Sequence, residues 1–161
     1  MKAGPKTESL ELTREIAAPP ERVFRALTNP EDLAKWWTGD VGGISRATFD
    51  LRPGGSYRLE FSMSKGMLAV VHGVVKEVDP PKRLVMTWFS PDHPKQETLL
   101  SFELEPIKKG TRLRLSHTGF TEPGSRDDHE HGWIEALTLL LSWITVAGPM
   151  FAAGARGTKE T

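Results

Sequence analysis

The stretch from about Ser125 to Ala147 constrains the fold most, because it has the spacing of one long amphipathic helix. Its apolar residues recur every three or four positions and therefore share one helical face: Trp133, Leu137, Leu140, Ile144 and Ala147. Gly148-Pro149 is predicted to end this helix. A helix with such a stripe needs a second layer to cover it.

The second layer is predicted from the alternation of apolar and polar residues in most of the remaining chain. Residues 9–16 form the first such segment, and about six more follow between residues 47 and 120. This period is typical of antiparallel strands with one solvent-exposed face. Two short helices interrupt the strands: Pro19-Pro20 opens the first, and Asn29-Pro30 closes it and starts the second. We predict an α+β fold in which the long helix lies in the concave side of one curved sheet.

Length and charge place the chain among single-domain proteins. It has 161 residues with 21 basic and 21 acidic side chains, so zero net charge gives no reason to expect a nucleic acid as partner. The absence of cysteine excludes disulfides and thiolate chemistry. No apolar run approaches the ~20 residues of a membrane span, and the first residues do not resemble a signal peptide. We expect a cytoplasmic protein with one domain over residues 8–150 and flexible termini at 1–7 and 151–161.

The polar cluster "DDHEHGW" at the start of the long helix resembles a metal site. However, His129 and His131 lie about 200° apart on a helix and do not chelate one ion. Asp127, His131 and Glu135 share one face, a spacing more typical of an ion-pair ladder. The acidic residues complement the helix dipole, with Ser125 as a candidate N-cap, and we expect no metal.

Three polar residues are predicted to face the interior. His129 precedes Trp133 by four positions and heads the apolar stripe of the helix, and His117 continues the inward register of the last strand. Arg14 falls on the apolar side of the first strand. If the first and last strands pair, Arg14 and His117 are expected about one cross-strand diagonal apart, ~7–8 Å. The alternatives are that His117 is a hydrogen-bonded core residue and that Arg14 reaches past the sheet edge to solvent.

Several aromatic residues also face inward by strand parity and helical spacing, and such a set is by default a core. A curved sheet under one helix is nevertheless hard to fill completely. We therefore expect a cavity lined by members of this set: Trp36, Trp37, Tyr57, Phe61, Trp88, Phe102 and Trp133.

Five ordered motifs carry a family resemblance: "APPERVFRALTNPEDLAKWW", "PGGSYRLEF", "GVVKEVDPPKRLVMTW", "SFELEPIKKGTRLRLSHTGF" and "HGWIEALTLLLSWI". Between about Leu10 and Ile144 the chain resembles the activator-of-heat-shock-protein-90-ATPase homology family of the START-like (SRPBCC) helix-grip superfamily. This resemblance implies a seven-stranded antiparallel sheet gripping the long helix, with two short helices at one end. It also implies a cavity for an apolar small molecule, but no single reaction, because the superfamily hosts many functions.

Our first functional hypothesis is a module that binds a small, mostly apolar molecule without a cofactor. For this module we favour a non-enzymatic role. The predicted ligand-binding residues are Arg14, Trp37, Tyr57, Phe61, Trp88, Phe102, His117, His129, Trp133 and Leu137. The second hypothesis is an enzyme of cyclase or hydratase type with His117 or His129 as general base. The third takes the family resemblance literally and makes the chain a partner that activates a chaperone ATPase.

The long helix carries a second apolar row, formed by Leu139, Trp143, Val146 and Met150. One sheet does not easily cover two rows. Either the short helices and residues 148–155 cover the second row, or it pairs with the same row of another subunit in a homodimer. Trp143 in the middle of the row favours the homodimer, through Leu139, Trp143 and Val146.

Overall fold

This computed structural model contains the predicted seven-stranded antiparallel sheet. The structure describes residues 7–38 and 42–160, with only the backbone for 146–160. Within these residues seven antiparallel strands form one sheet in the order β1-β7-β6-β5-β4-β3-β2. The strands are β1 (Glu8–Ile16), β2 (Gly43–Phe49), β3 (Ser56–Ser62), β4 (Leu68–Asp79), β5 (Arg83–Ser90), β6 (His93–Ile107) and β7 (Gly110–Phe120).

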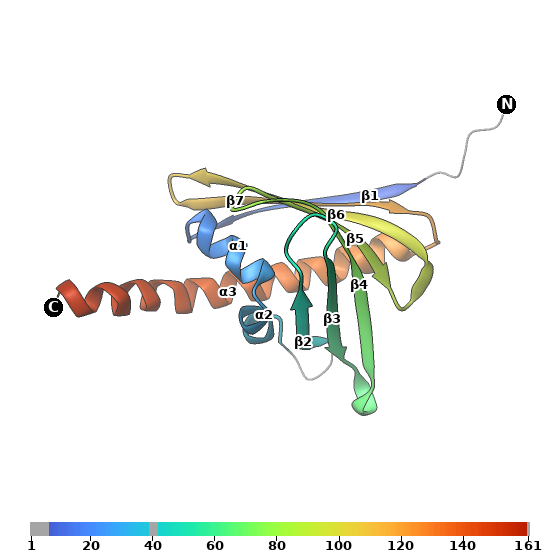
Figure 1. Cartoon of the computed structure of the whole chain (residues 1–161), viewed down its shortest axis with the longest axis horizontal. Helices are drawn as coiled ribbons and strands as arrows, with labels where there is room; N and C mark the ends of the chain where they lie inside the picture. The colour runs from blue at the N-terminus through green and yellow to red at the C-terminus, as the bar shows by residue number, and fades with distance from the viewer. Residues whose placement is uncertain (1–6, 39–41, 161) are drawn as a thin grey trace.

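One long helix, α3 (Ser125–Glu160), runs along one face of this sheet (Figure 1). The predicted stripe is confirmed as far as its side chains are described: Trp133, Leu137, Leu140 and Ile144 are all buried. The side chain of Ala147 lies outside the described residues. The predicted helix-grip architecture is therefore confirmed.

The predicted end of the helix at Gly148-Pro149 is wrong, because α3 continues to Glu160. A proline inside a helix lacks one N–H and crowds the carbonyl four residues earlier, which weakens a helix without always ending it. The sequence that follows contains several alanines, which have the highest helix propensity. The domain limits and the flexibility of both termini stay predictions, and residues 1–6 and 161 lie outside the described residues.

Two short helices follow the first strand, as predicted. They are α1 (Pro20–Thr28) and α2 (Pro30–Trp36). The Asn29 side chain caps α2 by accepting a hydrogen bond from the Asp32 N–H at 3.1 Å. The buried Trp36 indole donates to the Ala26 carbonyl at 2.7 Å and so fastens α2 to α1. This arrangement places Trp37, the next residue, beside the interior of the sheet.

The second apolar row is partly covered within the chain. Leu139 and Trp143 are half-buried against the core, and the Arg22 guanidinium of α1 lies 4.5 Å from the Trp143 ring centroid. A cation over an indole face is an attractive contact. The side chains of Val146 and Met150 lie outside the described residues. The homodimer through this row stays a prediction.

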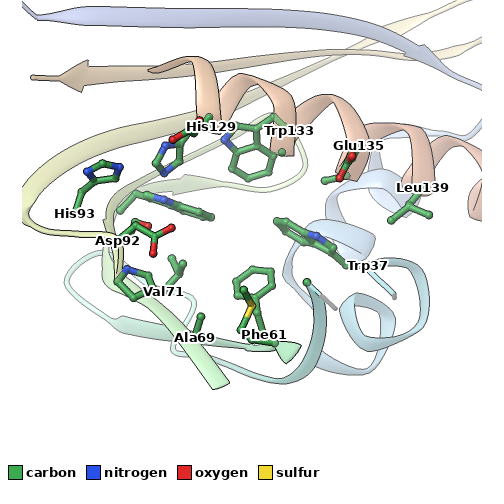
Figure 2. A pocket seen from close by; sticks show the side chains of 18 of the residues that line it. Trp37, Phe61, Ala69, Val71, Asp92, His93, His129, Trp133, Glu135 and Leu139 are labelled. Carbon is green, nitrogen blue, oxygen red and sulfur yellow. The ribbon is translucent and has the colours of Figure 1, made fainter. Parts of the chain in front are cut away.

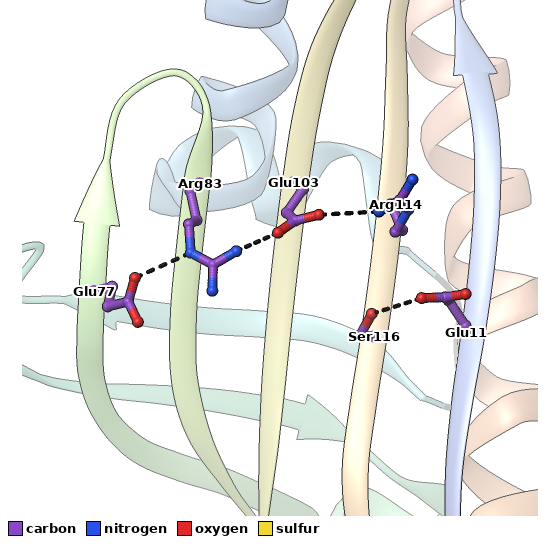
Figure 3. Close-up of polar contacts among 6 residues, drawn as sticks. All are labelled: Glu11, Glu77, Arg83, Glu103, Arg114 and Ser116. Carbon is purple, nitrogen blue, oxygen red and sulfur yellow. Dashed lines mark hydrogen bonds and ion pairs between the residues drawn. The ribbon is translucent and has the colours of Figure 1, made fainter.

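The outer face of the sheet carries a ladder of charged side chains across neighbouring strands (Figure 3). Arg83 on β5 contacts Glu77 on β4 and Glu103 on β6, and Glu103 in turn contacts Arg114 on β7. At the end of the series Ser116 donates to Glu11 of β1 at 3.3 Å. Exposed pairs of this kind contribute at most about 1 kcal/mol each. This face therefore supplies the polar half of the alternation.

Gly73 of β4 allows two strands to be bridged by a tyrosine. It pairs with Tyr57 of β3, whose hydroxyl donates to the Thr87 carbonyl of β5 at 2.6 Å. A Cβ atom at position 73 would overlap that same carbonyl oxygen. Only glycine therefore permits this close approach of β4 and β5.

We predict that Gly73→Ala lowers the free energy of unfolding by about 2 kcal/mol or more, because the overlap is with backbone. Gly132→Ala is a matched control in α3, where an added Cβ meets nothing within 4 Å. That substitution should raise the free energy by about 0.5–1 kcal/mol through helix propensity. Urea unfolding of the two variants measures both. Equal effects of the two substitutions would contradict the close approach at Gly73.

Candidate functional site: a pocket beside the start of the long helix

A pocket of about 340 Å³ lies between the first turns of α3 and the strands β3 to β5 (Figure 2). Its wall on the helix side is formed by His129, Gly132, Trp133, Ala136 and Leu139. On the sheet side it is formed by Phe61, Ala69, Val71 and Trp88, and at the end of α2 by Trp37. The elements that position the pocket are thus the long helix, three central strands and the short-helix pair.

Small residues on the helix explain why this space is not filled. Gly132 and Ala136 are four positions apart and face the pocket together, and Ala69 lies on the opposite wall. Larger side chains at these positions would extend into the space between helix and sheet. This pair was not predicted from the sequence, although two small residues four apart on the inward side of "HGWIEA" are visible there.

The wall of the pocket is largely aromatic. Trp37 lies 5.2 Å from Phe61 and 5.5 Å from Trp133, measured between ring centroids, and Trp133 lies 5.2 Å from Trp88. Phe61, Trp88 and Trp133 are buried. These four residues, all predicted as ligand contacts, are brought together by the fold. Rigid aromatic surfaces of this kind provide contact area at low conformational entropy.

His117 of β7 uses both ring nitrogens in hydrogen bonds, one to the helix and one to the neighbouring strand β6. The Trp133 indole N–H donates to His117 Nδ1 at 3.0 Å, so His117 carries its proton on Nε2. That N–H donates to Thr98 Oγ1 at 2.7 Å, and the Thr98 hydroxyl donates to the Trp88 carbonyl at 3.0 Å. The imidazole is completely buried. His117 is thus a hydrogen-bonded core residue, which was one of the two alternatives considered for it.

Burial keeps this imidazole neutral. Desolvation, with a smaller contribution from the nearby His129, lowers the pKa of His117 to about 2. A general base needs a pKa near the working pH and access to a substrate proton. His117 has neither, so the enzyme hypothesis loses one of its two residues.

His129 lines the pocket and keeps one ring nitrogen available. Its Nδ1–H donates to the Ser125 carbonyl at 2.8 Å, which leaves a lone pair on Nε2 of the neutral ring. Desolvation by burial lowers the pKa of His129, and the hydrogen bond to Ser125 opposes this shift only in part. The pocket therefore contains a neutral imidazole with a hydrogen-bond acceptor.

The mouth of the pocket is acidic. Asp92, Asp128 and Glu135 lie on its rim together with His93, whose Nδ1 lies 2.6 Å from Glu122 Oε1. The sequence analysis did not predict Asp92 or His93. Their signal was topological: the "SPDHPK" turn between β5 and β6 lies at the same end of the sheet as the start of α3, because β6 and β7 are antiparallel.

One buried donor in the wall has no partner among the described residues. It is the Trp88 indole Nε1, in a residue that lines the pocket. A buried unsatisfied N–H costs about 1–3 kcal/mol. Such exceptions are uncommon in folded proteins and call for an explanation.

Five of the ten predicted ligand contacts lie outside this pocket, namely Arg14, Tyr57, Phe102, His117 and Leu137. Tyr57 is a core residue whose hydroxyl is held by Thr87, and burial raises its pKa well above the usual range. Phe102 and Leu137 line a second space of only about 20 Å³, enough for about one water molecule. The interior beneath the pocket is thus nearly filled.

The predicted proximity of Arg14 and His117 is wrong. The first and last strands do pair, but His117 lies opposite Leu10 and Arg14 opposite Leu113. Four residues along a strand separate the two positions by about 13 Å. Arg14 donates to the Thr13 carbonyl of its own edge strand at 2.9 Å. The one-diagonal estimate failed because strand register is not visible in the residue pattern alone.

The structure offers no metal centre or membrane helix in the part of the chain that it describes. No group of three or more histidine, aspartate or glutamate side chains is arranged there to hold a metal ion. The predicted ladder on α3 reduces to one exposed pair, His131 with Glu135 at 3.3 Å, while Asp127 pairs with Arg126. None of the helices in this part combines the length and apolarity that crossing a bilayer requires.

The family model described as "Activator of Hsp90 ATPase homolog 1-like protein" matches residues 17–143. The chain belongs to this family. The resemblance that the sequence motifs predicted is thereby confirmed. A comparison with curated proteins gave no match.

Solved structures of similar proteins confirm the fold of this family member. A protein of Nitrosomonas europaea is 32% identical, with a TM-score of 0.73 over 86% of this chain and 95% of the other. An AHSA1 protein of Silicibacter pomeroyi is 27% identical, with a TM-score of 0.73 over 87% and 99%. A structure described as an HSP90 activator from Plasmodium falciparum is 25% identical, with a TM-score of 0.67 over 87% and 96%.

The buried His117 predicts a specific loss of stability in mild acid. Folding lowers its pKa, so the unfolded chain binds the proton more readily below the ordinary value of 6.5. Stability is therefore lost as the pH falls, by about 1.5–2 kcal/mol between pH 6.5 and 5 from this residue. Urea unfolding at the two pH values should show a smaller loss for His117→Gln than for the native chain. The control, His131→Gln on the exposed side of α3, should keep the native loss; equal losses in all three would contradict a buried neutral His117.

Proposed function

We propose that this chain is a binding module that takes a small, mostly apolar molecule into the pocket between α3 and the sheet. The observation that carries the proposal is the aromatic wall of Trp37, Phe61, Trp88 and Trp133 around about 340 Å³ of space. Ligand sites are typically concave, mostly apolar and lined by a few polar groups that fix orientation. The pocket has each of these properties, with its polar groups gathered at the rim.

The size of the pocket limits the ligand. A volume of about 340 Å³ lies at the lower end of the range for small-molecule sites. It suits a molecule with one or two fused rings rather than a long acyl chain, because the deeper space near Phe102 is almost closed. Burial of apolar ligand surface contributes about 25 cal/mol per Å² before the cost of association is subtracted. We therefore expect moderate affinity.

Two features support binding over catalysis. His117, the more deeply placed of the two histidines, uses both ring nitrogens in structural hydrogen bonds. His129 uses one nitrogen in the same way and has no hydrogen-bonded carboxylate to orient it among the described residues. A proton-transfer centre normally needs an oriented pair. The cyclase or hydratase hypothesis therefore has less support than the binding module.

A second candidate function is the activation of a chaperone ATPase. The family match favours it, together with the likeness to the P. falciparum structure described as an HSP90 activator. Its test is the ATPase rate of the cognate Hsp90 with and without this chain. An unchanged rate at saturating concentration would reject it without affecting the pocket proposal.

Filling the mouth of the pocket tests the binding proposal. We predict that the native chain binds the uncharged naphthalene fluorophore Prodan, which has two fused rings, and that Gly132→Leu weakens this binding by about tenfold or more. The added side chain meets open space at Gly132, so it occupies the pocket without strain in the helix. Fluorescence titration measures the affinity, and thermal unfolding checks the fold.

The control is Thr138→Leu, which places the same side chain on an exposed position of α3 outside the pocket lining. This variant should bind Prodan like the native chain. If the native chain does not bind, or if Gly132→Leu binds equally well, the pocket is not the ligand site.

A further inference from the structure

The charged residues that line the pocket all have one sign. Asp92, Asp128 and Glu135 contribute carboxylates, and no lysine or arginine is found among the described lining residues. The chain as a whole is neutral, so this local excess is not a consequence of composition. A concave site lined by one sign of charge concentrates ligands of the opposite sign.

The carboxylates at the polar end are not neutralised by neighbouring side chains. In the described part of the chain, the side-chain carboxylates of Asp92 and Asp128 make no ion pair or hydrogen bond, whereas that of Asp127, one position away, pairs with Arg126 at 3.0 Å. Figure 2 shows Asp92 extending into the pocket near His129. Glu135 lies over the other end of the pocket and pairs only with the exposed His131.

Two hydrogen-bonding groups at this end of the pocket, those of His129 and Asp92, are acceptors. The Nδ1–H of His129 donates to the Ser125 carbonyl, which leaves a lone pair on Nε2 as an acceptor. Asp92 offers carboxylate oxygens at the same end of the pocket. The Trp88 N–H is enclosed in the wall and is not solvent-accessible. A ligand that complements these groups must therefore bring hydrogen-bond donors.

The aromatic wall favours the same kind of ligand. The faces of Trp and Phe rings carry partial negative charge and attract cations. Trp37, Trp133 and Trp88 form a continuous series, with centroid separations of 5.5 and 5.2 Å. Such a surface accepts an apolar ring as well as a neighbouring ammonium group.

From these three features we infer that the pocket is selective for an organic cation, an aromatic or otherwise apolar body that carries a protonated amine. The amine lies at the end formed by Asp92, Asp128 and His129, and the apolar body lies against Trp37, Phe61 and Trp133. This inference rests on the proposed function and names the ligand class of the same site. It excludes fatty acids and other carboxylates as preferred ligands, because they meet three like charges and no lysine or arginine among the described lining residues.

The experiment compares three probes that share one ring system and differ in charge: naphthylmethylamine, naphthylmethanol and naphthylacetate. Isothermal titration calorimetry at low salt measures each affinity for the native chain. We expect the amine to bind about tenfold or more tightly than the acetate, with the alcohol between them. High salt should reduce the difference, because the rim carboxylates are exposed.

Charge variants assign the preference to the rim. The double variant Asp92→Asn, Asp128→Asn should bring the affinities of the amine and the acetate several-fold closer together. The matched control is Asp127→Asn, which removes a carboxylate from the same turn of α3 but outside the pocket lining. It should leave the ratio of the two affinities unchanged.

The outcomes separate the inference from the proposed function. If the alcohol binds but the acetate binds as tightly as the amine, the pocket is a ligand site without the proposed charge selectivity. An amine preference that survives the double substitution would also overturn the inference. No binding by any of the three probes would reject the proposed function together with the inference.

Discussion

The fold depends on attaching a single helix to one face of a curved sheet, and the hydrogen bond from Trp133 to His117 is central to this attachment. Trp133 is a residue of the helix and His117 belongs to β7, so the contact fixes the helix along its axis as well as against the sheet. The bond continues through Thr98 to the Trp88 carbonyl and thereby reaches β5. All the residues of this series are buried. Substitution of one of them would leave the polar group of its neighbour without a hydrogen bond, so the series favours this one position of the helix on the sheet.

The pocket is a consequence of the same attachment. The Trp133 indole is held in place by its hydrogen bond to His117, and the Trp88 ring lies against it at 5.2 Å between ring centroids, so the two rings form a rigid wall of the pocket. Gly132 precedes Trp133 on the helix and Ala136 follows it, and neither fills the space beside the indole. Rigid walls next to small residues give a preformed site, which lowers the entropic cost of binding. Stability and binding thus depend on neighbouring residues of one helical turn.

Most of the fold was predictable from the sequence, because it depends on periodicity. Alternation placed His117 inward and helical spacing placed His129 beside Trp133, and both positions are confirmed. The site was less predictable, since it depends on strand register and on the turn at Asp92 and His93. The register of β1 against β7 places Arg14 and His117 at separate positions along the strands. Tyr57, opposite Gly73, is a core residue and not part of the pocket wall. The small residues that open the pocket carry no chemistry of their own and were therefore overlooked.

The indole N–H resonances of the five tryptophans test the central claim most directly, because they report on the pocket and on the remainder of the protein in one spectrum. A nitrogen–proton correlation spectrum is recorded during titration with naphthylmethylamine, after assignment by single Trp→Phe variants. The account predicts shifts for Trp37, Trp88 and Trp133, which line the pocket, and none for Trp143, which packs against Arg22. Shifts confined to Trp143, or no shifts at saturating probe, would contradict a ligand site between the helix and the sheet.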